Sequence, residues 1–199
     1  MPTKIEVLGT ELCEIKDMCV AIAFFEDSLK LDKDIAGFDK TISSAISNSI
    51  KNRDFKAEAN EIKAFYANNG NVKYAALLGL GKEKDFNLNK LMDAVSALSK
   101  KLRNMDIRSF SIYFDSFKNK NFDFDTYLEK VTQAAALSLY QFTKYKTKDL
   151  DKVKTVDKAN IIVNKNDANK AKKIVNDALV YAEAANKTRD LVNTPPNIA

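Results

Sequence analysis

Tyr74-Ala75-Ala76-Leu77-Leu78-Gly79-Leu80-Gly81 is the stretch that decides the fold, because its apolar side chains follow one another without alternation and end at two glycines. Such a run is typical of a strand that is buried on both faces of a sheet. A helical period then begins, with Asn87 or Asn89 available as the N-terminal cap. The apolar positions of this helix form one stripe: Leu88, Leu91, Met92, Val95, Leu98 and Leu102. A buried strand that leads into an amphipathic helix indicates an α/β domain.

The remainder of the chain repeats this alternation of strand and helix patterns. Further strands are expected at Ile5–Val7, Met18–Phe25, 57–67, Phe110–Phe114 and Ile161–Val163. Further helical stripes cover 38–49 and 128–142, and a last helix runs from about Asp167, its expected cap, to Asp190. The tight-turn sequence Asn68-Asn69-Gly70-Asn71 would join two neighbouring strands directly, which makes the sheet mixed. The pattern therefore predicts three layers, with a mixed, mostly parallel sheet flanked by helices.

The last helix carries a stripe of small side chains. Its inward positions are expected to be Ala171, Ile174, Val175, Ala178, Ala182 and Ala185. Pro195 and Pro196 cannot continue a helix, so we expect an extended and mobile tail from Leu191 to Ala199, with Ile198 among its apolar residues.

Length and composition place the chain among ordinary globular domains. It has 199 residues, of which 45% are hydrophobic and 30% charged, enough for one domain with a substantial core. The longest apolar run, Met18–Phe25, is far shorter than the roughly 20 residues of a membrane span. The N-terminus lacks the basic and apolar regions of a signal peptide, so a cytoplasmic location is expected.

The absence of histidine limits the possible chemistry. Ser-His-Asp triads, Cys-His pairs and metal sites that need imidazole are excluded because the chain has no histidine. Cys13 and Cys19 are the only cysteines, too few for an all-cysteine zinc site. Cys19 lies within an apolar run and is interpreted as a core residue.

Positive charge is concentrated in one part of the chain. Residues 144–173 contain ten lysines and four aspartates, a local charge of +6, whereas the whole chain carries +5. A basic stretch can bind nucleic acid, and this alternative stays open. Neither arginines nor aromatic side chains for stacking on bases follow Lys146 in this stretch, which favours a solvated, lysine-rich surface.

Three short motifs suggest chemistry but are incomplete. Gly79-Leu80-Gly81-Lys82 follows a strand, yet it lacks the third glycine of a dinucleotide site and the Gly-Lys-Ser/Thr ending of a phosphate-binding loop. The acidic residues Asp115, Asp123, Asp125 and Glu129 lie among lysines and aromatics without a glycine-shaped loop, so a solvated surface is expected there. Asn186-Lys187-Thr188 matches a glycosylation sequon, which we interpret as a chance match.

The end of the chain carries a long and specific resemblance. Thr188-Arg189-Asp190-Leu191-Val192-Asn193-Thr194-Pro195-Pro196-Asn197 closely resembles the ARDLVNTPPN segment of the leucyl aminopeptidase family. Three further landmarks agree in order, namely Asp54-Phe55-Lys56, Leu77–Lys82 and Leu139–Lys146. One departure is Lys56-Ala57-Glu58-Ala59, where the family often has Gly-Lys-x-Gly.

The resemblance implies an N-terminal, non-catalytic domain with a macro-domain-like fold. Residues 1–166 would form this domain, 167–190 a connecting helix, and 191–199 the start of a catalytic domain. Family members are aminopeptidases with two divalent cations, zinc or manganese, and their subunits form hexamers. The metal ligands lie in motifs resembling VGKGxTFDTGG, DMKGA and NTDAEGR, which this chain does not contain. Accordingly, no catalytic, cofactor-binding or metal-ligating residue is assigned here. The resemblance leaves a nucleotide, such as ADP-ribose, as a further alternative ligand.

Overall fold

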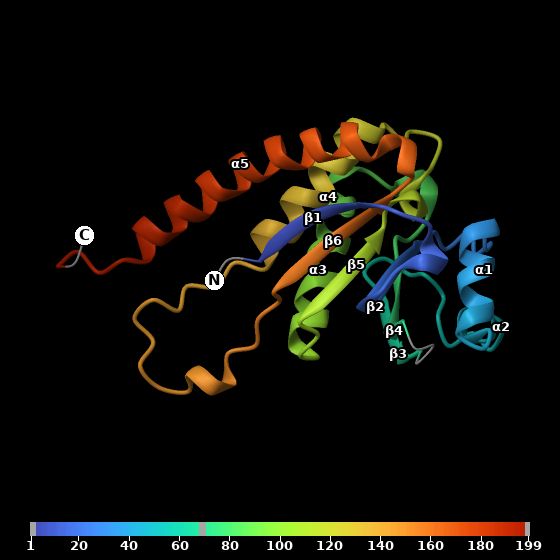
Figure 1. Ribbon diagram of the computed structural model, residues 1–199, viewed down its shortest axis with the longest axis horizontal. Coiled ribbons are helices and arrows are strands. Elements are labelled where there is room, and N and C mark those ends of the chain that lie inside the picture. The colour runs from blue at the N-terminus through green and yellow to red at the C-terminus, as the bar shows by residue number, and fades with distance from the viewer. Residues whose placement is uncertain (1–2, 68–70, 198–199) are drawn as a thin grey trace.

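The computed structural model describes residues 3–67 and 71–197 and shows one sheet with helices on both faces (Figure 1). The strands are β1 (Lys4–Gly9), β2 (Asp17–Phe24), β3 (Ile62–Tyr66), β4 (Val72–Gly79), β5 (Ser109–Tyr113) and β6 (Lys158–Val163). The α-helices are α1 (Lys33–Thr41), α2 (Ala45–Lys51), α3 (Leu88–Asn104), α4 (Phe124–Ser138) and α5 (Ala168–Asn193). The expected α/β class is confirmed.

The sheet is mixed and mostly parallel, as the sequence predicts. Its strand order is β1-β6-β5-β2-β4-β3. Strand β3 pairs antiparallel with β4, and the other pairings in the described part of the chain are parallel. The antiparallel pair agrees with a direct connection between these strands, although residues 68–70 of the expected turn lie outside the described residues.

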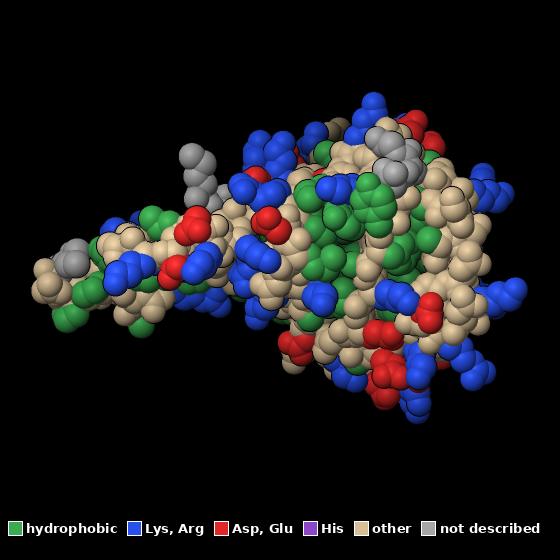
Figure 2. Space-filling model, turned by 90° about the horizontal axis from the view of Figure 1, so that it is seen from below, with side chains coloured by type: hydrophobic (Ala, Val, Ile, Leu, Met, Phe, Trp, Pro, Cys, Tyr) green, Lys and Arg blue, Asp and Glu red, His purple; other side chains and the backbone are tan. Residues whose placement is uncertain are grey.

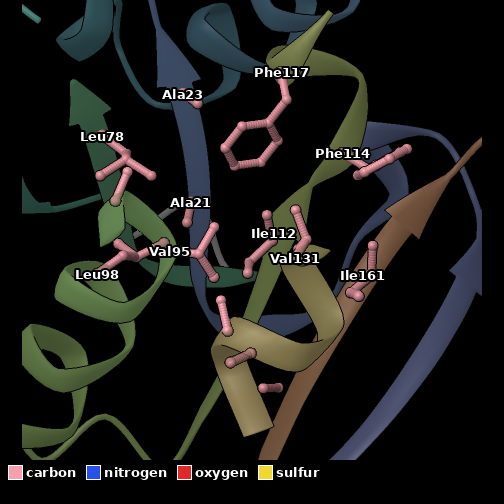
Figure 3. Packing of buried hydrophobic residues seen from close by; sticks show 14 of the residues in the cluster. Ala21, Ala23, Leu78, Val95, Leu98, Ile112, Phe114, Phe117, Val131 and Ile161 are labelled. Carbon is pink, nitrogen blue, oxygen red and sulfur yellow. The ribbon is translucent and has the colours of Figure 1, made fainter. Parts of the chain in front are cut away.

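Two hydrophobic cores lie on opposite faces of the sheet. Alternate side chains of β2 divide between them, with Ala21 in the core beneath α3, α4 and α5, and Ile22 in the core beneath α1 and α2. Figure 3 shows the first core, in which Val95 of α3 and Val131 of α4 approach side chains of the central strands. This double coverage explains why the central strands are apolar without alternation.

Several boundaries differ from the expectation. The single stripe at 38–49 forms two helices, because Ser43 and Ser44 both adopt a left-handed conformation with φ of 58°. The buried Asp39 carboxylate accepts a hydrogen bond from the Ile46 amide at 2.7 Å and so fixes the start of α2. The second half of the stripe therefore belongs to a separate helix, α2.

The other strand and helix ends differ by a few residues. The strand expected at 57–67 begins only at Ile62, because Ala57 and Asn60 have positive φ. Phe114 belongs to a 3₁₀ helix (Phe114–Phe117) and not to β5. The stripe at 128–142 ends early, because α4 stops at Ser138.

The last helix is longer than the sequence predicts. Helix α5 continues through Asn193, so the expectation of an extended chain from Leu191 is wrong for three residues. Proline disfavours helical geometry in the residue before it, and Thr194, which precedes Pro195, is indeed extended with ψ of 128°. Four predicted inward positions, Ala171, Val175, Ala178 and Ala182, are buried, but Ala185 is exposed. Ile198 lies outside the described residues.

Candidate functional site

The glycine turn after β4 is a structural element. The amides of Gly79, Leu80 and Gly81 donate to the carbonyl oxygens of Glu61, Phe24 and Ala57 at 2.8, 2.9 and 2.9 Å. A Cβ atom on Gly79 would lie 2.0 Å from the Glu58 carbonyl oxygen. Gly79 therefore permits close contact between two backbone segments. The three amides of the turn already have carbonyl partners and are not available to hold a phosphate.

The four acidic candidates are engaged separately by the chain itself. Asp115 pairs with Lys118 at 2.8 Å, and Asp123 caps α4 through the Thr126 amide. Asp125 pairs with Lys170, and Glu129 accepts hydrogen bonds from Lys130 and Gln133. Within residues 3–67 and 71–197, no group of three or more histidine, cysteine, aspartate or glutamate side chains could hold a metal ion.

Neither cysteine shows the features of a nucleophile. Cys19 is fully buried in the core of α3 to α5, as expected, and burial raises the pKa of its thiol. Cys13 is exposed on the short 3₁₀ helix (Leu12–Glu14) after β1, and partial burial followed by nearby carboxylates raises its pKa as well. Both thiols are therefore protonated near neutral pH.

The lysine-rich stretch does not form one continuous surface. Several of its lysines lie on the long loop at 139–157, at the lower left of Figure 1, whereas Lys170, Lys172 and Lys173 lie at the start of α5 on the upper right. Some of these lysines bind the chain itself: Lys152 pairs with Asp149 at 2.7 Å, and Lys154 donates to the Asn104 carbonyl at 2.6 Å. The positive charge is thus dispersed.

The feature that stands out from the domain is the C-terminal half of α5. Its first half packs on β1 and α4, and its second half extends beyond the sheet as an arm (Figure 1). Polar contacts with the end of α4 fix the angle of this arm. Arg189 donates to the Leu137 carbonyl at 2.9 Å and lies over the Tyr140 ring, and the Tyr140 hydroxyl donates to Asp190 at 2.7 Å. The sequon residue Asn186 belongs to this brace, since its side chain donates to the Ala136 carbonyl at 3.4 Å.

The arm carries exposed apolar side chains at its tip. Leu191 is 67% exposed and Val192 80%, and closer to the domain Val180 and Tyr181 are also exposed. Figure 2 shows hydrophobic side chains near the end of the arm, among charged residues. Large apolar side chains that gather on one projecting element indicate a surface for a protein partner. The sequence motif at 188–197 marked this region, but its helical form up to Asn193 and its contacts with the end of α4 were not predicted from it.

None of the helices in the described ranges has the length and apolar character needed to cross a membrane.

Comparisons with known proteins agree on one family. The sequence pattern of the "Cytosol aminopeptidase family, N-terminal domain" matches residues 21–149. A "Probable cytosol aminopeptidase" of Sulfurihydrogenibium sp. is 32% identical over 198 residues, which cover 98% of this chain and 38% of that protein. A "Probable cytosol aminopeptidase" of Rickettsia bellii is 30% identical over 182 residues, covering 89% of this chain and 36% of that protein. The chain thus spans less than two fifths of these relatives.

Solved structures show the same fold at lower sequence identity. A mutant of tomato leucine aminopeptidase superposes with a TM-score of 0.79 at 14% identity, over 100% of this chain and 40% of that one. The bottromycin maturation enzyme BotP, in complex with Mn, gives a TM-score of 0.64 at 17% identity, over 90% of this chain and 32% of that one.

Proposed function

This chain belongs to the cytosol aminopeptidase family and matches its N-terminal domain, and on that premise we propose that it is the non-catalytic accessory domain of a metal-dependent leucyl aminopeptidase. The whole protein would remove N-terminal amino acids from peptides. The relatives carry the aminopeptidase name, and more than three fifths of the Sulfurihydrogenibium protein lies outside the matched region. We assign the hydrolytic chemistry to that remaining part.

The exposed tip of α5 is the observation that carries this proposal. Leu191 and Val192 lie beyond the body of the domain on a braced arm, and they continue into the NTPPN segment. A catalytic domain that follows in the same chain would cover these side chains. We therefore place the connecting helix at 168–193 and the start of the catalytic domain after it, in place of the boundary at Asp190.

The divalent cations of the family do not fit this domain. The four acidic candidates lie apart and each contacts other residues of the chain, and the described residues offer no group of metal ligands. We propose that two zinc or manganese ions bind in the catalytic part of the whole protein, as the BotP complex with Mn suggests for a structural relative. No step of the reaction is assigned to residues of this chain.

The remaining properties implied by the resemblance are part of the same proposal. They are a hexamer of full-length subunits, a cytoplasmic location in agreement with the names of the relatives, and a macro-domain-like fold. Nucleic-acid binding stays a secondary alternative, and the division of the lysines between opposite ends of the domain does not favour it.

Two experiments test the proposal. The first reads the gene after codon 199, where we expect an open frame with motifs resembling VGKGxTFDTGG, DMKGA and NTDAEGR. The second measures leucyl-p-nitroanilide hydrolysis with manganese or zinc. We expect no activity from this chain alone, and activity from a chimera in which it replaces the matching part of the Sulfurihydrogenibium protein. Metal-dependent hydrolysis by the purified chain, above a mock preparation, would contradict a non-catalytic role.

A matched pair of variants tests the role of the arm within the chimera. Leu191→Gln/Val192→Gln keeps good helix formers at the tip but removes its apolar surface. We expect this variant to reduce the yield of active chimera. Leu150→Gln, at a residue of the loop at 139–157 that is 57% exposed, should leave the yield unchanged. Equal yields for both variants would show that the tip is not covered by the catalytic domain.

A further inference from the structure

A crevice of about 490 Å³ opens where the connections of the sheet diverge. It lies at the carboxyl ends of the adjacent strands β2 and β5, and its walls include the first turn of α1. The chain leaves β2 towards α1 on one face, whereas it leaves β5 towards α4 on the other. Open α/β sheets bind ligands at such a switch point, and the volume suits a small molecule. The position of the crevice does not by itself identify a ligand, which depends on the chemistry of the lining residues.

The lining of the crevice is charged with both signs in equal number. Three lysines and three aspartates line it: Lys30, Lys33, Lys118, Asp32, Asp34 and Asp115. Burial, and then the charges of these three aspartates, raise the pKa of Tyr113. The Tyr113 hydroxyl therefore remains a protonated donor.

Each carboxylate has one oxygen committed to the chain. Asp32 caps α1 through the Ile35 amide at 2.7 Å. Asp34 accepts from the Tyr113 hydroxyl at 3.2 Å, across the crevice from β5 to α1. The committed oxygen of Asp115 binds Lys118 and Asn164, both at 2.8 Å. These contacts hold the carboxylates in place.

Other donors and acceptors on the lining are still available. Among residues 3–67 and 71–197, the second carboxylate oxygen of Asp32, Asp34 and Asp115 accepts no hydrogen bond from a side chain or from the backbone. In the same part of the chain, Lys30 and Lys33 form no ion pair. The crevice thus offers both cationic donors and anionic acceptors within the space of one small ligand.

We propose that this crevice binds a free α-amino acid, with its ammonium group on the aspartates and its carboxylate on Lys30 and Lys33. A purely anionic ligand such as phosphate would face three carboxylates, and a purely cationic ligand would face three lysines. A ligand that carries both charges matches both sets. Ser116 also lines the crevice. Its hydroxyl donates to the Tyr113 carbonyl and accepts from the Ala23 amide.

Calorimetry and NMR titration of the 199-residue chain with leucine test this inference. The comparison ligands are isoamylamine, which lacks the carboxylate, 4-methylpentanoate, which lacks the ammonium group, and inorganic phosphate. We expect saturable binding of leucine, with amide shifts at the ends of β2 and β5, and binding about fivefold or more weaker for each comparison ligand. Equal or tighter binding of phosphate would replace the inference with an anion site, and a lack of saturation with leucine would refute it.

Charge-neutral variants locate the site. Lys33→Gln and Asp34→Asn, both at exposed positions of α1, should each weaken leucine binding by about fivefold without lowering the melting temperature. Lys40→Gln, in the last turn of the same helix and away from the crevice, is the matched control. Unchanged affinity in both crevice variants would contradict the proposal. The inference rests on the charges of the crevice, so it can fail while the proposed aminopeptidase role stands, and the reverse also holds.

Discussion

Replacement of Gly79 by alanine tests whether the glycine turn after β4 serves the fold. The new Cβ would lie 2.0 Å from the Glu58 carbonyl oxygen, and 2.7 and 2.9 Å from the carbonyl carbon and Cα of Ala57. Real Cβ contacts rarely fall below 3.0 Å, so the two segments must separate by about 1 Å. All the atoms concerned belong to the backbone, and no flexible side chain can move aside.

The cost follows from the hydrogen bonds that join these segments. The Asn60 amide donates to the Gly79 carbonyl at 3.0 Å, the Gly79 amide to Glu61 at 2.8 Å, and the Gly81 amide to Ala57 at 2.9 Å. A separation of about 1 Å takes all three beyond hydrogen-bonding distance. At about 1 kcal/mol for each bond, Gly79→Ala should lower the free energy of unfolding by about 3 kcal/mol. For a chain of this length the melting temperature should fall by about 6–12 °C.

Urea denaturation and calorimetry measure this loss, with Gly37→Ala as the control. Gly37 lies inside α1, and its Cβ would meet only the Cys13 sulfur, at 3.2 Å. There alanine gains about 1 kcal/mol of helix propensity against a mild contact, so the free energy of unfolding should stay within about 1 kcal/mol of wild type. If Gly79→Ala were as stable as Gly37→Ala, the reasoning about close backbone approach would be wrong.

Two further substitutions and two measurements on the unchanged chain probe other parts of the domain. Ala182→Leu adds bulk at a position on the buried side of α5 that is 1% exposed, and should cost roughly 1–3 kcal/mol in denaturant melts. Asp39→Ala removes the buried cap of α2 and should cost about 1–2 kcal/mol by the same measurement. Thiol labelling of the native chain should modify Cys13 alone, and labelling of both cysteines at equal rates would contradict the buried position of Cys19. Any binding of duplex DNA by residues 144–173 should be weak, indifferent to sequence and abolished by salt, whereas tight binding at about 200 mM salt in an electrophoretic assay would overturn this.

The architecture could be predicted because periodicity reports burial directly. The uninterrupted apolar runs of β2 and β4 and the stripe of α3 require two helical layers around a sheet. The break between α1 and α2 could not be predicted, since Ser43 and Ser44 adopt positive φ without the glycine or asparagine that usually marks it. Ala57 is a similar case before β3.

The candidate surface was only partly predictable. The resemblance at residues 188–197 marked this segment, but the contacts that link the arm to the end of α4 join residues about 50 positions apart, such as Tyr140 and Asp190. The charged crevice had no signal in the sequence, because Asp34 and Asp115 meet only when β2 and β5 become neighbours.

The braced arm of α5 also acts as a lever. At 1.5 Å per residue, the segment from Ala182 to Asn193 reaches about 17 Å beyond its last buried alanine. A tilt of about 10° at that alanine would move the tip by about 3 Å, enough to misplace whatever polypeptide follows. The contacts of Arg189 and Asp190 with Leu137 and Tyr140 lie about two thirds of the way along this span, where they restrict such a tilt far better than contacts at its base. Small side chains at the base and polar anchors farther out thus fix the direction in which the arm leaves the domain.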